Sequence, residues 1–154
     1  MKSHPTPRQA LVEQLFESMN TLKRGMYSQL HVINRDLPIS RSQIELLMAI
    51  RHAQPVSFKE LAKQLCLTPG AISQLAEGLE QLELIERKTS IADRRLQYLE
   101  TSKKGATLLQ DVEKRRRKLL ETVMQDLSDE ELELWLRIQQ KMINQFQSET
   151  TETK

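Results

Sequence analysis

Cysteine and aromatic residues are scarce in this chain. A single cysteine, Cys66, excludes a disulfide within the 154 residues. Three Phe, two Tyr and one Trp are few for a monomer that must bury its own core, and burial shared with a second copy would relieve that shortage. The first thirty residues contain no long apolar run of the kind a signal peptide or membrane span needs, so we expect a cytoplasmic protein with no membrane partner.

An excess of charge of one sign is also missing. The 23 Lys and Arg residues nearly balance 21 Asp and Glu, which leaves a formal charge of +2. Nucleic-acid binding must therefore be argued from the distribution of charge and not from its total. His4, His31 and His52 share no metal-ligand spacing with one another or with Cys66, and no carboxylate pair accompanies a recognisable nucleophile. We expect no metal site, no cofactor and no catalytic residues, so the chain is not predicted to be an enzyme.

Apolar residues at spacings of three and four predict a long amphipathic helix over residues 8–37. The stripe consists of Leu11, Leu15, Met19, Leu22, Met26, Leu30 and Ile33. It needs a partner surface, which favours a role in dimerisation.

Three start signals predict short helices between residues 40 and 82. They are the capping boxes Ser40–Gln43 and Ser57–Glu60, and the N-cap Thr68 followed by Pro69. The first of these helices should end at Gln54-Pro55. Only a tight turn separates the second helix from the third, so the two should cross steeply, as in a helix-turn-helix.

The helix that starts at Thr68 has two distinct faces. Its predicted buried stripe is Ile72, Leu75, Leu79 and Leu82, and its outward side carries Gly70, Ala71, Ser73, Gln74 and Glu77. A helix in this position enters the major groove of DNA, where side chains contact base edges. The candidate DNA-binding residues of this helix are Thr68, Pro69, Gly70, Ala71, Ser73 and Gln74.

Two strand-like runs follow and predict a β-hairpin. Its inward positions are expected to be Leu84, Ile85, Leu96 and Tyr98. The loop carries Asp93, Arg94 and Arg95, and arginines at such a tip can enter the minor groove. The alternative is an ordinary solvated tip with an exposed ion pair, which would stabilise the fold by only about 0 to 1 kcal/mol. Since stability gives little reason for two arginines there, we favour DNA contact.

Two more helices are predicted over residues 102–148, starting at Ser102 and at the capping box Ser128–Glu131. The basic run 114–118 interrupts the apolar stripe of the first. A solvated face is favoured over a second DNA-binding patch. An internal role is open as well, in which the run pairs with acidic residues of the same or a partner chain. These acidic residues are Asp126, Asp129, Glu130, Glu131 and Glu133.

The order of these elements resembles the MarR family of bacterial transcription regulators over roughly residues 11–146. The resemblance rests on Ile-Ser-Arg-Ser-Gln at 39–43, Glu-Leu-Ala-Lys-Gln-Leu at 60–65, Leu-Ile-Glu-Arg-Lys at 84–88, Asp-Arg-Arg at 93–95 and Lys104-Gly105. It implies a homodimer with intertwined terminal helices, a pseudo-palindromic double-stranded DNA operator and a small-molecule effector pocket between the dimerisation and DNA-binding regions.

The resemblance also assigns roles to single residues. Asp93 would brace the wing tip, Arg95 would enter the minor groove and Arg94 would contact a phosphate. Gln74 stands where many members carry a basic residue, and adenine is the base that glutamine favours. Glu83 occupies the usual glycine position after the recognition helix, where a left-handed residue is expected at a cost on the order of 1 kcal/mol.

Two further sites have competing interpretations. Cys66 is expected to be a buried structural residue and not a redox sensor, because small residues are wanted for close packing in its turn. Met26, His31, Ile44, Leu47 and Met48 are candidates for the effector pocket, with plain core as the favoured alternative.

The sequence therefore predicts a mainly α fold with a small β-hairpin wing, in one domain over 1–154. It comprises a dimerisation helix (8–37), a winged helix-turn-helix (40–101) and C-terminal support and dimerisation helices (102–148). The predicted function is that of a homodimeric, sequence-specific DNA-binding regulator, more often a repressor in this family, which a small apolar or aromatic ligand releases. The alternative is a winged-helix protein-interaction module without sequence-specific DNA binding.

Overall fold

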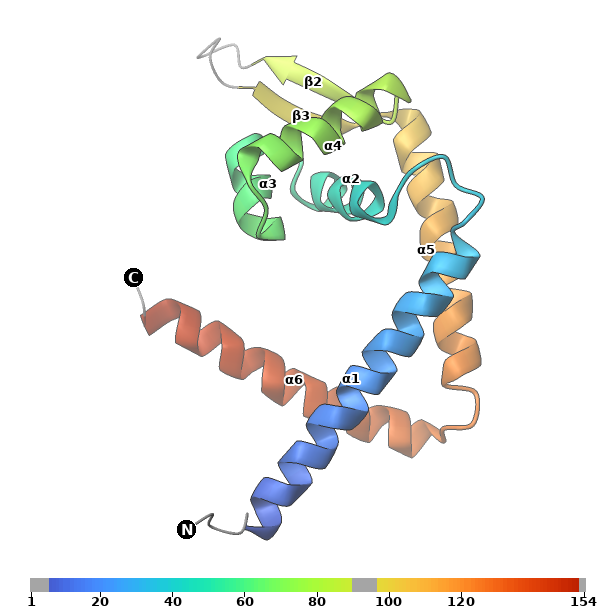
Figure 1. The fold of residues 1–154 in the computed structure, drawn as a ribbon, viewed down its shortest axis with the longest axis vertical. Coiled ribbons are helices and arrows are strands. Elements are labelled where there is room, and N and C mark those ends of the chain that lie inside the picture. Colours follow the sequence, from blue (N-terminus) through green and yellow to red (C-terminus); the bar gives the residue numbers. More distant parts are fainter. Residues whose placement is uncertain (1–5, 90–96, 153–154) are drawn as a thin grey trace. The chain divides into compact units, whose positions relative to one another are not determined.

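The computed structural model describes residues 6–89 and 97–152, with side chains as far as Gln147. Within these residues the helices are α1 (Pro7–Ile33), α2 (Arg41–Ala53), α3 (Phe58–Leu65), α4 (Pro69–Gln81), α5 (Lys103–Val123) and α6 (Asp129–Glu152). The strands are β1 (Val56–Ser57), β2 (Ile85–Thr89) and β3 (Gln97–Thr101) (Figure 1). The chain divides into two compact units, Met1–Arg117 and Lys118–Lys154. The predicted mainly α fold with a small antiparallel sheet is confirmed.

The predicted helix starts are confirmed by hydrogen bonds between side chains and backbone. Ser40 Oγ accepts from the Gln43 N–H, and the Gln43 side chain accepts in return from the Ser40 N–H at 2.8 Å. The same reciprocal pair forms at Ser57–Glu60 and at Ser128–Glu131. These local bonds satisfy amides that have no partner inside the helix. None of the helices in the described ranges combines the length and apolar character that crossing a bilayer takes.

The sheet contains one strand more than the sequence predicted. Its order is β1-β3-β2, with both pairs antiparallel, and the short β1 places Val56 beside Leu99 of β3. Leu99 is fully buried, whereas Tyr98 is only half-buried. The prediction that Tyr98 points inward was therefore wrong by one residue, because successive side chains of a strand lie on opposite faces. Leu96, the other predicted inward residue of this strand, lies outside the described residues.

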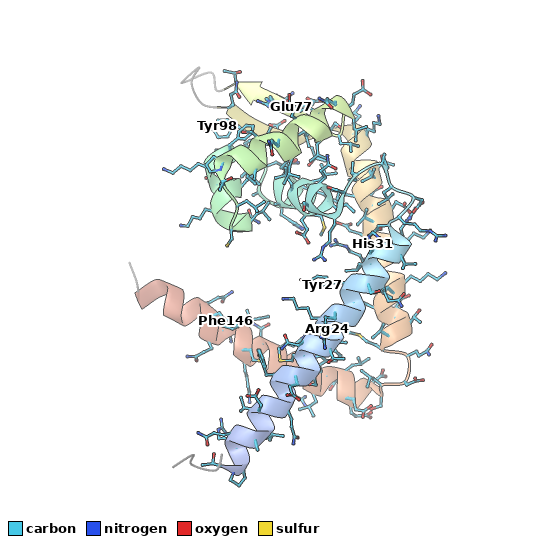
Figure 2. All side chains as sticks on the ribbon, in the orientation of Figure 1. Arg24, Tyr27, His31, Glu77, Tyr98 and Phe146 are labelled. Carbon is cyan, nitrogen blue, oxygen red and sulfur yellow. The ribbon has the colours of Figure 1, made fainter. Side chains whose placement is uncertain are left out.

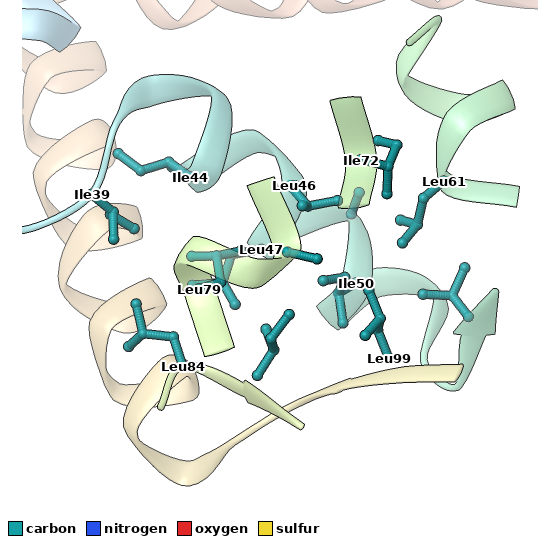
Figure 3. Close-up of a cluster of buried hydrophobic side chains, with 14 of the residues drawn as sticks. Ile39, Ile44, Leu46, Leu47, Ile50, Leu61, Ile72, Leu79, Leu84 and Leu99 are labelled. Carbon is teal, nitrogen blue, oxygen red and sulfur yellow. The ribbon is translucent and has the colours of Figure 1, made fainter. Parts of the chain in front are cut away.

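The hydrophobic core surrounds α2 (Figure 3). The spacing of Ile44, Leu47, Met48 and Ile50 predicts the inward stripe of α2. Met48 is only half-buried, and Leu46 and Ala49, which lie outside this stripe, are buried together with the other three. This helix packs against α3, α4 and β3 at once. A helix covered on several sides is apolar on several faces, so a single stripe underestimates its burial.

Arg115 of α5 joins three segments of the first unit. Its guanidinium donates hydrogen bonds to the carbonyl oxygen of Ile33 at 2.6 Å and to the carboxylate of Asp36, and its Nη2 forms an ion pair with Asp111 Oδ2 at 2.8 Å. The hydrogen bond from Arg115 lowers the pKa of Asp36 below its ordinary value. The last turn of α1 and the linker to α2 are thereby fixed to the middle of α5.

The basic run 114–118 therefore has two roles. Arg115 and Arg116 face the protein, and Arg116 Nη1 lies 2.9 Å from Met48 Sδ of α2. Lys114, Arg117 and Lys118 are exposed, as the predicted solvated face requires. The partners of Arg115 within the first unit are Asp36 and Asp111, and pairing of the run with the acidic group at 126–133 stays a prediction.

Gly105 allows α5 to start directly beneath the turn after α4. The Ser102 hydroxyl accepts from the Gly105 N–H at 3.0 Å and donates to the Glu83 carbonyl at 2.7 Å, while the Ser102 N–H donates to the Leu84 carbonyl at 3.1 Å. A Cβ on Gly105 would overlap the Leu84 carbonyl oxygen, which is backbone and cannot rotate away. Glycine is required here by space alone.

We predict that Gly105→Ala destabilises the protein by about 1 to 3 kcal/mol, because the added methyl group forces the start of α5 away from Leu84. Gly25→Ala is the matched control, since nothing lies within 4 Å of its Cβ position on α1. Alanine in a helix interior should leave stability unchanged or raise it by up to about 1 kcal/mol. Urea unfolding of both variants checks this pair, and equal effects would contradict it.

Candidate nucleic-acid interface

The turn between α3 and α4 is a Schellman motif centred on Cys66. The Cys66 N–H donates to the Lys63 carbonyl at 3.4 Å and the Leu67 N–H to the Ala62 carbonyl at 3.0 Å. Cys66 adopts a left-handed conformation with φ of 53°. Its side chain is exposed, so the prediction of a buried structural cysteine was wrong. The small residue that allows close packing here is Ala62, which is buried.

A second Schellman motif ends α4 at Glu83. The Glu83 N–H donates to the Glu80 carbonyl at 2.8 Å, and the Leu84 N–H donates to the Leu79 carbonyl at 2.9 Å. Glu83 has φ of 60°, so the expected left-handed residue is present without the usual glycine. Leu84 is buried beneath this turn. The two motifs fix the direction of the chain on either side of α4.

Helix α4 uses one face for the core and leaves the other face open. The side chain of Thr68 accepts from the Ala71 N–H at 3.2 Å, and Pro69 occupies the first helical position, as predicted. Ile72, Ala76 and Leu79 are fully buried. The predicted buried residues Leu75 and Leu82 are only half-buried, because the inward stripe passes through the small Ala76 instead.

The candidate contacts on α4 gather on its open side. Gly70, Ser73 and Gln74 are exposed, whereas Ala71 is half-buried. A Cβ on Gly70 would meet nothing within 4 Å, so neither crowding nor backbone conformation explains this glycine. Figure 2 shows Glu77 on the side of α4 that faces away from α2, and this residue is exposed as well.

Arg87 connects the base of the predicted wing to both helices of the helix-turn-helix. Its Nε lies 2.6 Å from Glu80 Oε1 of α4, and its guanidinium lies over the ring of Phe58, the first residue of α3, at 5.1 Å from the ring centroid. Sequence reasoning used Arg87 only as part of a motif and missed this contact, since no local pattern links positions 58, 80 and 87. The predicted tip residues Asp93, Arg94 and Arg95 lie outside the described residues, and their DNA contact stays a prediction.

Positive charge near α4 comes from its neighbours. α4 contains two glutamates and no Lys or Arg. Lys59 and Lys63 of α3 are exposed, and neither has an ion-pair partner in the described part of the chain. In a helix-turn-helix the first helix crosses the DNA backbone while the second enters the groove. In such an arrangement the ammonium groups of Lys59 and Lys63, on the first helix, would lie near the phosphates.

The five candidate pocket residues lie in two kinds of environment. Ile44 and Leu47 are buried in the core around α2. Met26 and Met48 are half-buried, and His31 is exposed at the end of α1. Core packing explains the first two residues, and an effector pocket stays a prediction for the other three.

Comparison with known proteins identifies the family. The model of the MarR family matches residues 39–96. An uncharacterized HTH-type transcriptional regulator of Bacillus subtilis, YxaD, is 30% identical over 108 residues, which cover 70% of this chain and 76% of YxaD. The chain belongs to the MarR family. The part of the chain that aligns covers about two thirds of the length of the first curated relatives. Curated relatives of this MarR-family chain carry names of transcriptional regulators and not of enzymes.

Solved structures show the MarR fold over most of the chain. A MarR family protein from Bacillus stearothermophilus superposes with a TM-score of 0.82 at 20% identity, covering 90% of this chain and 96% of that one. The Staphylococcus aureus MepR-DNA complex superposes with a TM-score of 0.68 at 21% identity, covering 84% and 96%. At these identities the similarity establishes the winged-helix fold.

We predict that Glu83→Gly stabilises this MarR-family protein by about 0.5 to 1 kcal/mol, because glycine adopts a φ near 60° without steric cost. Glu83→Ala is the control, since it also removes the exposed pair with Lys104 but keeps a Cβ in the left-handed region. Thermal unfolding measures both variants. The explanation fails if glycine is no more stable than alanine at this position.

Proposed function

We propose that this chain is a homodimeric, sequence-specific DNA-binding regulator of transcription that works in the cytoplasm. The observation that carries the proposal is the open face of α4, which is presented between two Schellman turns while its opposite face is buried. Family membership supports it, as does the MepR-DNA complex among the structural neighbours. In the proposed complex, two recognition helices bind successive major grooves of a pseudo-palindromic duplex about 34 Å apart. The major groove is contacted by Thr68, Pro69, Gly70, Ala71, Ser73 and Gln74. Arg95 enters the minor groove, Arg94 contacts a phosphate and Asp93 braces the wing tip.

The apolar faces of α1 and α6 support dimerisation. α1 contains no buried residue, and Leu11, Leu15 and Phe16 are each more than half exposed. On α6, Leu134, Leu136 and Phe146 are more than half exposed too. Apolar surface of this extent supports the proposed interface, because burying it against a second copy would remove it from water.

We further propose that the protein is a repressor and that a small apolar or aromatic acid releases it from DNA. The half-buried Met26 and Met48 offer apolar contacts. Arg116, whose Nη1 meets Met48, has a buried Nε with no hydrogen-bond partner among the described residues. A carboxylate would provide that partner. Such a ligand acts only if it binds the DNA-incompetent dimer better than the competent one.

The DNA proposal is tested by selecting duplexes from a random pool and titrating the enriched site with salt. We expect an inverted repeat with half-sites about one helical turn apart and an affinity that falls steeply with salt. Lys63→Ala should weaken binding to all sequences alike and lower the salt slope by about one. Lys141→Ala, an exposed lysine on α6, is the control. No enriched site would favour the protein-interaction module instead.

The dimer proposal is tested by measuring the molar mass with light scattering as the protein elutes from a size-exclusion column. We expect twice the chain mass of 17.9 kDa. Phe16→Glu should shift the protein toward the monomer, because it places a charge in the proposed apolar interface. Glu13→Gln, which changes only a polar residue of the same helix, should leave the mass unchanged. A wild-type monomer at micromolar concentration would refute the proposal.

A further inference from the structure

The open face of α4 is rich in hydrogen-bond acceptors and contains no cation. At 100° per residue, Gly70, Gln74, Glu77 and Gln81 fall within a narrow stripe, and all four are exposed. The whole helix contains no lysine or arginine. Lys and Arg are the residues that bind guanine O6 and N7. This stripe therefore has no side chain suited to that contact.

Glu77 differs from the other glutamate of this helix. The carboxylate of Glu80 is held by Arg87 at 2.6 Å at the edge of the helix. Glu77 has neither a hydrogen bond nor an ion pair in the described part of the chain, and it lies in the middle of the stripe, facing away from α2 (Figure 2). An unpaired carboxylate brought against DNA is repelled by the phosphates and loses water, which weakens binding unless an amino group donates to it.

The major groove presents two amino groups, N6 of adenine and N4 of cytosine. Adenine places the acceptor N7 beside its amino group. The second carboxylate oxygen would face this nitrogen, and two acceptors repel each other. Cytosine has a C5–H group at the corresponding place, so the acceptor beside N4 is only the O6 of its paired guanine, just as thymine O4 lies beside adenine N6. A carboxylate in the groove is therefore matched best by cytosine.

We propose that Glu77 is a specificity-determining residue that accepts a hydrogen bond from cytosine N4 in the operator. This inference rests on the proposed DNA-binding function and extends it to a base that the helix selects. Glu77 lies three positions after Gln74, which is a rise of about 4.5 Å along the helix. The cytosine consequently lies about one or two base pairs from the adenine expected at Gln74. The glutamate also excludes sequences without a donor at that position, which is specificity through repulsion.

The test is duplex selection with wild type, Glu77→Gln and Glu77→Ala, followed by competition among operators that differ at one base pair. We expect the wild type to prefer cytosine at one position of each half-site by about tenfold. Glu77→Gln should change that preference to adenine, because an amide both donates to N7 and accepts from N6. Glu77→Ala should abolish the preference while keeping the rest of the site.

Glu13→Gln on α1 removes the same charge away from this face and should leave every base preference unchanged. The inference is overturned if both Glu77 variants enrich the wild-type site, or if they change affinity by the same factor for all sequences. Those results leave the DNA-binding function standing, since the wild type would still enrich an operator. If the wild type enriches no site, the proposed function fails and this inference fails with it.

Discussion

Burial of the inner face of α4 against α2 is the interaction on which the rest of the structure depends. Ile72, Ala76 and Leu79 are fully buried, and each large apolar side chain removed from water stabilises the fold by about 1.5 to 3 kcal/mol. Because this face is committed to the core, the opposite face of the same helix is necessarily presented outward. The Schellman motifs at Cys66 and Glu83 then fix the direction of the chain before and after α4. A rigid helix with one free face is what binding in a groove requires.

Arg115 gives the second constraint, because it fixes the end of α1, the helix proposed for dimerisation, to the middle of α5. Its guanidinium holds the last carbonyl of α1, the linker carboxylate of Asp36 and Asp111 of its own helix. The lowered pKa of Asp36 means that this joint contributes stability above the ordinary carboxyl pKa and loses it as the pH falls through the folded value. Any reorientation of α1 must break or rearrange these contacts. In the proposed regulator, an effector bound near Met48 and Arg116 would lie next to this joint.

Local chemistry made much of the fold predictable from the sequence. The capping boxes at Ser40 and Ser57 place two helix starts, because the bonds involve residues only three apart. Features that depend on distant partners were missed or mistaken. Strand β1 forms only because it pairs with β3. Leu46 is buried because α3, α4 and β3 all pack against α2. Arg115 is hydrogen-bonded to Asp36, which lies 79 residues earlier in the chain. For the candidate site, the sequence identified the open face of α4 but not the contact of Arg87 with Glu80 and Phe58.

The most direct test of the central claim, that the open face of α4 is the DNA-binding surface, is NMR mapping of amide shifts in the labelled protein as a selected duplex is added. The account predicts that the largest changes fall at Gly70, Gln74 and Glu77, with smaller changes at the exposed lysines of α3. Helix α6 should change little, since it has no part in the proposed contact. Shift changes confined to α1 and α6, with α4 unaffected, would contradict the account.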